Sequence, residues 1–85
     1  MRIERIKQKL QQKFQPEILE LVDKSALHQG HFQGGGDETH LALKIAAQEF
    51  KKISLVESHR MINQLLADEF EKGLHAIEIR IIKNS

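Results

Sequence analysis

The chain has 85 residues, with 13 Lys and Arg against 12 Asp and Glu, five histidines and no cysteine. A chain of this length forms one domain, here residues 1–85, so any binding site must be small or shared with a partner. The lack of cysteine excludes disulfides and metal sites built from the chain's own thiolates. The formal net charge of +1 is far from the strongly basic balance expected where phosphate contacts dominate binding.

Basic residues are concentrated near the N-terminus. Residues 1–14 contain a single acid, Glu4, among five basic side chains: Arg2, Arg5, Lys7, Lys9 and Lys13. A basic helix can contact nucleic acid, but an ordinary solvated helix face is the commoner explanation. No apolar run approaches the ~20 residues of a membrane span, and the start of the chain lacks the apolar core of a signal peptide. We therefore expect a soluble cytoplasmic protein that does not enter a membrane.

The first predicted elements are a helix and a strand. Apolar residues recur at helical spacing over residues 2–14, and Pro16 ends this helix. Residues 17–23 include a short apolar run, and its shortness favours a strand over a helix. Residues 24–38 hold four of the five glycines and no periodic pattern, so we predict a loop. A loop of this length is usually functional or disordered.

Two further strands enclose a second helix. Apolar and other residues alternate over 39–47, which predicts the second strand. Ser54 and Glu57 form a capping box that starts a helix over about 55–71, ending at Gly73. Its predicted apolar stripe consists of Leu55, Val56, His59, Ile62, Leu65, Leu66 and Phe70. Alternation from His75 to Ile81 predicts the third strand.

The order of these elements predicts a two-layer α+β fold, αββαβ. The first two strands can pair antiparallel, whereas a helical crossover between the second and third requires parallel pairing if they are neighbours. The result is a mixed three-stranded sheet with both helices on the same face.

The histidines are the chemically distinctive residues. His59 falls on the apolar stripe and is interpreted as a core histidine whose ring bonds a backbone group. His75 follows a helix end, where the dipole favours a cation, but it is equally placed to act as a ligand at a strand edge. His28 and His31 in the loop, and His40 after it, are solvated by default. The alternative is that the loop and the third strand bring His31 and His75 together.

Two imidazoles cannot complete a zinc site or hold an iron–sulfur cluster alone. A partner that supplies thiolates could complete such a site, and it would weaken as imidazole becomes protonated. The sequence has no phosphate-binding Walker loop, and its serines lack a base with an orienting group. We therefore do not expect an enzyme.

Several segments, in order along nearly the whole chain, resemble the BolA family: Asp23-Lys24-Ser25, His28-Gln29-Gly30-His31, Glu38-Thr39-His40-Leu41, Phe50, Leu55-Val56-Glu57-Ser58-His59-Arg60-Met61-Ile62 and Leu74-His75-Ala76-Ile77. The resemblance implies an α+β fold similar to a type II KH domain. It also implies partnership with a monothiol glutaredoxin, in which the heterodimer shares a [2Fe-2S] cluster. The glutaredoxin cysteine and glutathione would supply sulfur. His75 occupies the family's C-terminal histidine position, and His31 occupies the loop position that is histidine or cysteine in relatives.

On this expectation the isolated chain binds no cluster and is a monomer or weak homodimer. The resemblance implies a second function, DNA binding and transcriptional regulation in stress response and cell morphology, with Lys51, Lys52, His59 and Arg60 as candidate contacts. Two departures from the family pattern affect that surface: Lys52 replaces a usual glycine and Ser58 a usual arginine. Glutaredoxin partnership is the favoured expectation, DNA the alternative; a ligand role for His28 or His40 stays open.

Overall fold

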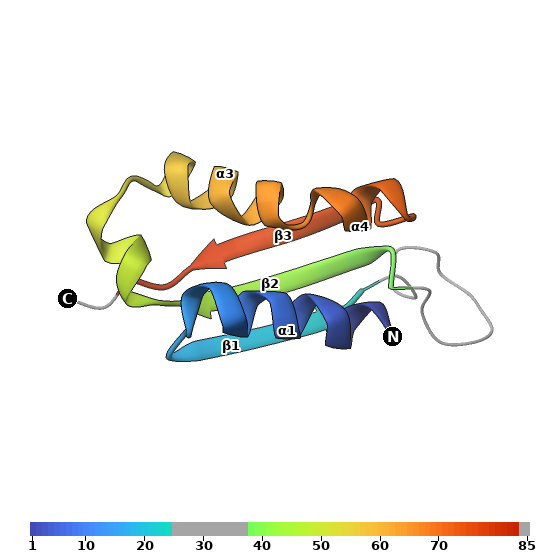
Figure 1. The fold of residues 1–85 in the computed structure, drawn as a ribbon, viewed down its shortest axis with the longest axis horizontal. Coiled ribbons are helices and arrows are strands. Elements are labelled where there is room, and N and C mark those ends of the chain that lie inside the picture. Colours follow the sequence, from blue (N-terminus) through green and yellow to red (C-terminus); the bar gives the residue numbers. More distant parts are fainter. Residues whose placement is uncertain (25–37, 84–85) are drawn as a thin grey trace.

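The structure, a computed structural model, describes residues 1–24 and 38–83, arranged as a sheet covered by helices (Figure 1). Its elements in chain order are α1 (Arg2–Phe14), β1 (Ile18–Asp23), β2 (His40–Ala46), the 3₁₀ helix η1 (Gln48–Lys52), α3 (Leu55–Leu65), α4 (Ala67–Glu71) and β3 (Ala76–Ile81). The predicted α+β class is confirmed. The predicted loop at 24–38 falls almost wholly outside the described residues.

The three strands form one mixed sheet in the order β1-β2-β3. β1 pairs antiparallel with β2, so that Leu21 lies opposite Leu43. β2 pairs parallel with β3, so that Leu43 lies opposite Ile79 and His40 opposite Ala76. This is the predicted topology, and it places the starts of β2 and β3 at one edge of the molecule.

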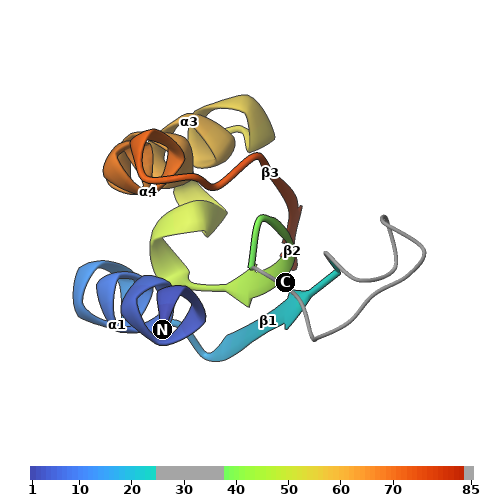
Figure 2. The same ribbon diagram turned by 90° about the vertical axis from the view of Figure 1, so that its right-hand side faces the viewer.

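The helices cover one face of this sheet, as predicted (Figure 2). α1 ends where Gln15 adopts a left-handed conformation, φ 48°, and its N–H bonds the Gln11 carbonyl at 3.0 Å. Pro16 then prevents the helix from continuing. The buried residues of both layers form a single core: Ile6, Leu10, Phe14, Leu21, Leu41, Leu43, Ile45, Ala47, Phe50, Ile62, Leu66 and Leu74.

The helix predicted over 55–71 is divided in two. Ser54 caps α3 as expected, since its hydroxyl accepts the Glu57 N–H at 3.1 Å. The division lies at Leu66, where φ is −99° and ψ is 12°. There the Glu69 N–H bonds the Leu66 carbonyl at 2.9 Å, a three-residue spacing that tightens the turn. Leu66 is fully buried at this point.

The predicted apolar stripe is wrong at its start. Leu55 and Val56 are 52% and 67% exposed, whereas Ser58 is fully buried. Val56 precedes Ile62 by six residues, which at 3.6 residues per turn puts it about 120° away from the buried face. Leu55 lies on the first turn of α3. His59, expected in the core with its ring bonded to a backbone group, is half-buried and is not among the buried core residues.

The 3₁₀ helix η1 was not predicted from the sequence. It carries Phe50, which is fully buried, with its ring centroid 4.7 Å from that of Phe14. The short helix thus closes the end of the core that lies between α1 and the sheet.

Candidate histidine site and basic surface

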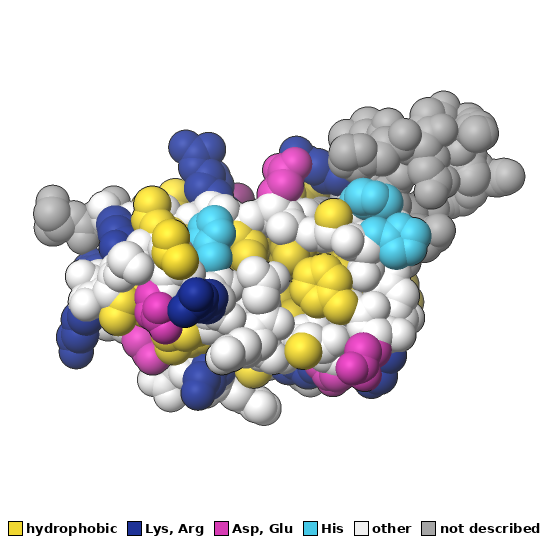
Figure 3. All heavy atoms as spheres, turned by 90° about the horizontal axis from the view of Figure 1, so that it is seen from above, with side chains coloured by type: hydrophobic (Ala, Val, Ile, Leu, Met, Phe, Trp, Pro, Cys, Tyr) yellow, Lys and Arg dark blue, Asp and Glu magenta, His cyan; other side chains and the backbone are white. Residues whose placement is uncertain are grey.

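The structure brings together His40 and His75. Their ring centroids lie 5.5 Å apart with the rings perpendicular. The pair lies at the end of the sheet where His40 is the first residue of β2 and His75 directly precedes β3. Figure 3 shows two histidine side chains next to each other at this end of the molecule. His75 is exposed and His40 is half-buried, so the pair is accessible to another molecule.

Backbone hydrogen bonds fix the separation of the two histidines. The N–H groups of His75 and Ala76 both donate to the Thr39 carbonyl, at 2.8 and 3.1 Å. These bonds extend the parallel pairing by one step beyond β3. The Thr39 hydroxyl also lies 3.1 Å from Nδ1 of His40, a contact that orients the imidazole ring.

The separation of the two rings, 5.5 Å between centroids, is that of two ligands of one metal ion. Imidazole nitrogens bind a metal at about 2 Å, which places two ring centroids on one ion roughly 5 to 6 Å apart. Within residues 1–24 and 38–83, however, no group of three or more His, Asp or Glu side chains could hold a metal. The described part of the chain therefore brings together two imidazoles and no third ligand for a metal ion.

A hollow of about 140 Å³ adjoins the pair on the uncovered face of the sheet. It is lined by Lys24, His40, Leu41, Ala76, Ile77 and Glu78. The Lys24 ammonium lies 3.9 Å from the Glu78 carboxylate across it. The surroundings of His40 are thus partly apolar and partly charged.

The other predicted ligand, His31, lies outside the described residues, as does His28. His40, which sequence reasoning left undecided, is the histidine that the described structure places beside His75. The signal was present in the sequence, since both residues stand at the starts of strands predicted to pair parallel. The register that brings them side by side could not be read from the pattern.

Three basic residues of α1 bind the buried carboxylate of Glu69 on α4. Arg5 donates from Nε and Nη2 to the two carboxylate oxygens, each at 2.9 Å. Arg2 Nε lies 3.3 Å and Lys9 Nζ 3.8 Å from the same group. The bonds from Arg5 lower the pKa of the Glu69 carboxyl below its ordinary value, against the opposing effect of burial. These side chains are therefore engaged within the molecule.

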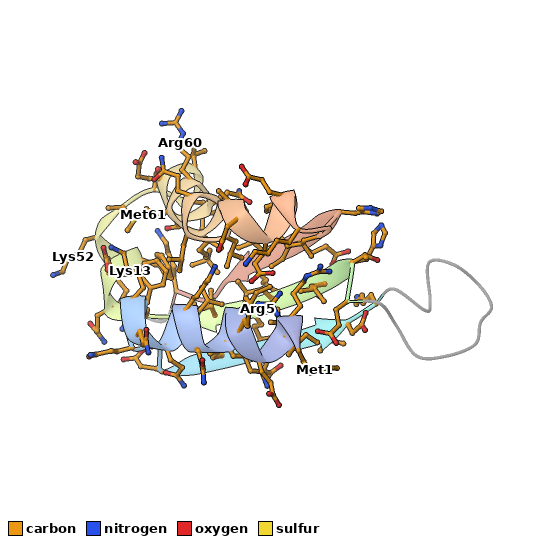
Figure 4. All side chains as sticks on the ribbon, turned by 45° about the vertical axis from the view of Figure 1, so that its right-hand side comes forward. Met1, Arg5, Lys13, Lys52, Arg60 and Met61 are labelled. Carbon is orange, nitrogen blue, oxygen red and sulfur yellow. The ribbon has the colours of Figure 1, made fainter. Side chains whose placement is uncertain are left out.

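The candidate nucleic-acid contacts lie elsewhere. Lys51 and Lys52 are exposed on η1, and Arg60 is exposed on α3, 3.8 Å from Glu57. In Figure 4, Lys52 and Arg60 point into solvent in different directions, whereas Arg5 lies on the side of α1 that faces α4. His59, on α3, is half-buried. Of the basic residues of α1, Arg2, Arg5 and Lys9 bind Glu69, whereas Lys13 lines a hollow with Met61, Gln64 and Leu65 of α3.

None of the helices in the described part of the chain combines the length and the apolar character needed to cross a membrane.

Comparison with known proteins identifies several relatives. An uncharacterized protein from Sinorhizobium sp. is 41% identical over 78 residues, which cover 89% of this chain and 84% of that protein. SufE-like protein 1 of Arabidopsis thaliana is 42% identical over 80 residues, 88% of this chain but 22% of that protein. The DNA-binding transcriptional regulator BolA of Vibrio cholerae is 35% identical over 74 residues, 87% of this chain and 67% of that protein.

The fold and the family agree. The solved BolA domain of SufE1 from Arabidopsis thaliana has a TM-score of 0.84 and 41% sequence identity, covering 96% of this chain and 91% of that one. Residues 10–85 match the model of the family described as BolA-like protein. The chain belongs to the BolA-like protein family.

Proposed function

We propose that this chain is a binding module that pairs with a monothiol glutaredoxin and shares a bridging [2Fe-2S] cluster with it, in iron–sulfur trafficking or iron and redox regulation. The observation that carries the proposal is the pair of imidazoles, exposed in His75 and half-buried in His40, with ring centroids 5.5 Å apart. A chain that offers two imidazoles and no thiolate needs sulfur ligands from a partner. The glutaredoxin cysteine and glutathione supply them.

His75 is the ligand common to both possible pairs. The family resemblance joins it to His31, and the geometry joins it to His40. Histidine ligands on one iron of a [2Fe-2S] cluster raise its potential relative to four thiolates. The role of the chain is then to bind one side of the cluster and to set its reactivity, without catalysis by its own side chains.

Reconstitution with a monothiol glutaredoxin, glutathione, iron and sulfide tests the proposal. Visible absorption and circular dichroism are recorded for the wild-type pair and for His75→Ala, His40→Ala and His31→Ala. We expect His75→Ala to change the spectrum. One of the other two variants, His40→Ala or His31→Ala, should change it by at least as much. His59→Gln on α3 is the control, and it is expected to leave the spectrum unchanged.

The outcomes separate the ligand sets. Spectra altered in His75→Ala and His40→Ala but not in His31→Ala support the geometric pair. Spectra altered in His75→Ala and His31→Ala but not in His40→Ala support the pair inferred from the family. A spectrum unchanged in all three variants contradicts the ligand assignment. Failure of the wild-type chain to form a coloured complex contradicts the proposed function itself.

A second candidate function is DNA-binding transcriptional regulation. It is favoured by exposed Lys51, Lys52 and Arg60 and by the Vibrio cholerae relative, which is named a DNA-binding transcriptional regulator. Because Arg2, Arg5 and Lys9 are bound to α4, the contribution of α1 to phosphate binding is reduced.

Salt dependence of duplex DNA binding tests this candidate. Removing one phosphate-binding side chain should reduce the slope of log K against log salt by about 1, so Lys51→Ala/Lys52→Ala should lower it by about 2. Lys44→Ala, on the sheet face opposite the helices, removes a charge elsewhere and is the control. Affinity of the wild type no tighter than roughly 10⁻⁴ to 10⁻⁶ M, the nonspecific range, contradicts the regulator function.

A further inference from the structure

Arg2 contacts both segments that carry the candidate histidines. Its Nη1 donates to the Glu38 carbonyl at 2.7 Å, two residues before His40. Its Nη2 donates to the Lys72 carbonyl at 2.9 Å, three residues before His75. The side chain is only 15% exposed, and its Nε faces the buried carboxylate of Glu69 at 3.3 Å. One planar guanidinium thus joins the start of β2 to the turn between α4 and β3.

Both contacted segments are shaped to receive this group. Glu38 adopts a left-handed conformation with φ 60°, and its carboxylate accepts the Ile3 N–H at 2.7 Å. The segment before β2 is therefore held to the first turn of α1 through two bonds. On the other side, Gly73 has φ +122°, and a Cβ there would lie 3.1 Å from Arg2 Nη2. The glycine leaves room for the guanidinium beside the turn.

We propose that Arg2 is a positioning residue that sets the separation of His40 and His75. The inference rests on the proposed function, in that it assigns the two histidines as a ligand pair. Arg2 acts through its bonds to the Glu38 and Lys72 carbonyls, which hold the two segments joined by the hydrogen bond from His75 N–H to the Thr39 carbonyl. Arg2 also lies before residues 10–85, the part of the chain that matches the family model. The positioning role of Arg2 is therefore not implied by that match.

Arginine suits this role because two separate nitrogens of one rigid plane, Nη1 and Nη2, donate to the two carbonyls. A lysine ammonium lacks the planar fork that matches two carbonyls on different segments. Arg5 provides a matched comparison, because it binds the same Glu69 carboxylate with two hydrogen bonds. Its described bonds run to Glu69, not to the segments that carry the histidines. The two arginines therefore differ in what they hold, while both support α4.

The test compares Arg2→Met, Arg2→Lys and Arg5→Met in the full chain. All three are made in a His28→Ala/His31→Ala background, so that these two histidines cannot bind the added metal in place of His40 and His75. The first readout is the nuclear Overhauser effect between the His40 and His75 ring protons in the isolated protein. The second is affinity for Ni²⁺ added as a probe. Loss of a group that orients metal ligands typically costs 10- to 100-fold in affinity.

We expect Arg2→Met to weaken the ring-to-ring effect and to lower Ni²⁺ affinity about 10-fold, with Arg2→Lys intermediate. Arg5→Met should keep the wild-type ring-to-ring effect and Ni²⁺ affinity, even if its melting temperature falls by as much as that of Arg2→Met. Wild-type readouts in Arg2→Met, or an equal loss in Arg5→Met, would overturn the inference. Because both readouts use the isolated chain, their result is independent of glutaredoxin pairing, whose failure would count only against the proposed function.

Discussion

The carboxylate of Glu69, which has no exposed surface, accepts two parallel hydrogen bonds of 2.9 Å from the guanidinium of Arg5, across 64 residues of sequence. This bidentate geometry is the strongest that an arginine and a carboxylate form. It fastens α1 to α4, and so ties the N-terminal helix to the last turn before the histidine-bearing segment.

Glu69→Ala should destabilise the protein by about 3 kcal/mol, at the low end of the range for a broken buried pair, since Arg5 can be partly solvated. Its neighbour provides the control. Asp68 binds Lys9 at 2.6 Å, but its side chain is half exposed, so Asp68→Ala should cost far less. Urea denaturation of the two variants measures the difference, and equal costs would contradict the assignment of Glu69 as the buried anchor.

Acidification should lower the free energy of unfolding, because it protonates the carboxylate of Glu69. Hydrogen bonds from Arg5 lower the pKa of Glu69 in the folded state, so this contribution to stability is full above the unfolded pKa of about 4.3. It is lost as the pH falls through the lower folded pKa. Glu69→Gln should be less stable at neutral pH and should lose less stability on acidification. Unfolding measured from pH 7 to pH 3 checks this, with the exposed Glu71→Gln as control.

Phe50 should be the costliest aromatic side chain to truncate. It is fully buried and packs at 4.7 Å between centroids against Phe14, so Phe50→Ala should cost about 3 to 5 kcal/mol. Val56→Ala, at a position 67% exposed, should change stability by less than about 0.5 kcal/mol. A large effect at Val56 would restore the apolar stripe that the structure contradicts.

Gly73→Ala should cost about 1 to 3 kcal/mol, because alanine is strained at φ +122°. Part of the cost arises from the approach of its Cβ to Arg2 Nη2, at 3.1 Å. In an Arg2→Ala background the same substitution should therefore cost less. A double-mutant cycle of unfolding free energies separates the two parts, and strict additivity would show that the close approach contributes nothing.

Ser54→Ala should cost about 1 kcal/mol, since it removes the acceptor for the Glu57 N–H at the start of α3. Ser54→Asp keeps an acceptor in place and should retain most of the wild-type stability. Thermal unfolding followed by circular dichroism distinguishes the two variants. Equal losses would mean that the hydroxyl, rather than its capping bond, is what matters at this position.

Local patterns predicted those parts of the fold that depend on residues close in sequence. Alternation at Leu41, Leu43 and Ile45 located β2, and Pro16 located the end of α1. The helix η1 was missed because one aromatic residue, Phe50, in a five-residue 3₁₀ helix leaves no periodic pattern. Glu69 was missed because its burial depends on Arg5, 64 positions away, and nothing in the spacing of α4 indicates that partner.

The candidate site, like the fold, was predicted where it depends on local patterns and missed where it depends on residues distant in sequence. His75 was identified as a residue at the edge of a strand, and the structure places it there. Its neighbour His40 depends on the register of a parallel pair, which a pattern of apolar residues leaves undetermined. The assignment of His31 remains a prediction, since it lies outside the described residues.

The positions of the histidine pair and of η1, at the two ends of the long axis of the molecule (Figure 1), limit how two partners could compete. A small protein seated on His40 and His75 leaves Lys51 and Lys52 uncovered, so simple steric blocking does not make the two partners mutually exclusive. If a glutaredoxin and DNA were found to displace each other, the antagonism would have to be transmitted through the sheet as a coupling free energy, and each would weaken the other by the same factor. If they do not displace each other, the distance between the two surfaces leaves room for both partners at once.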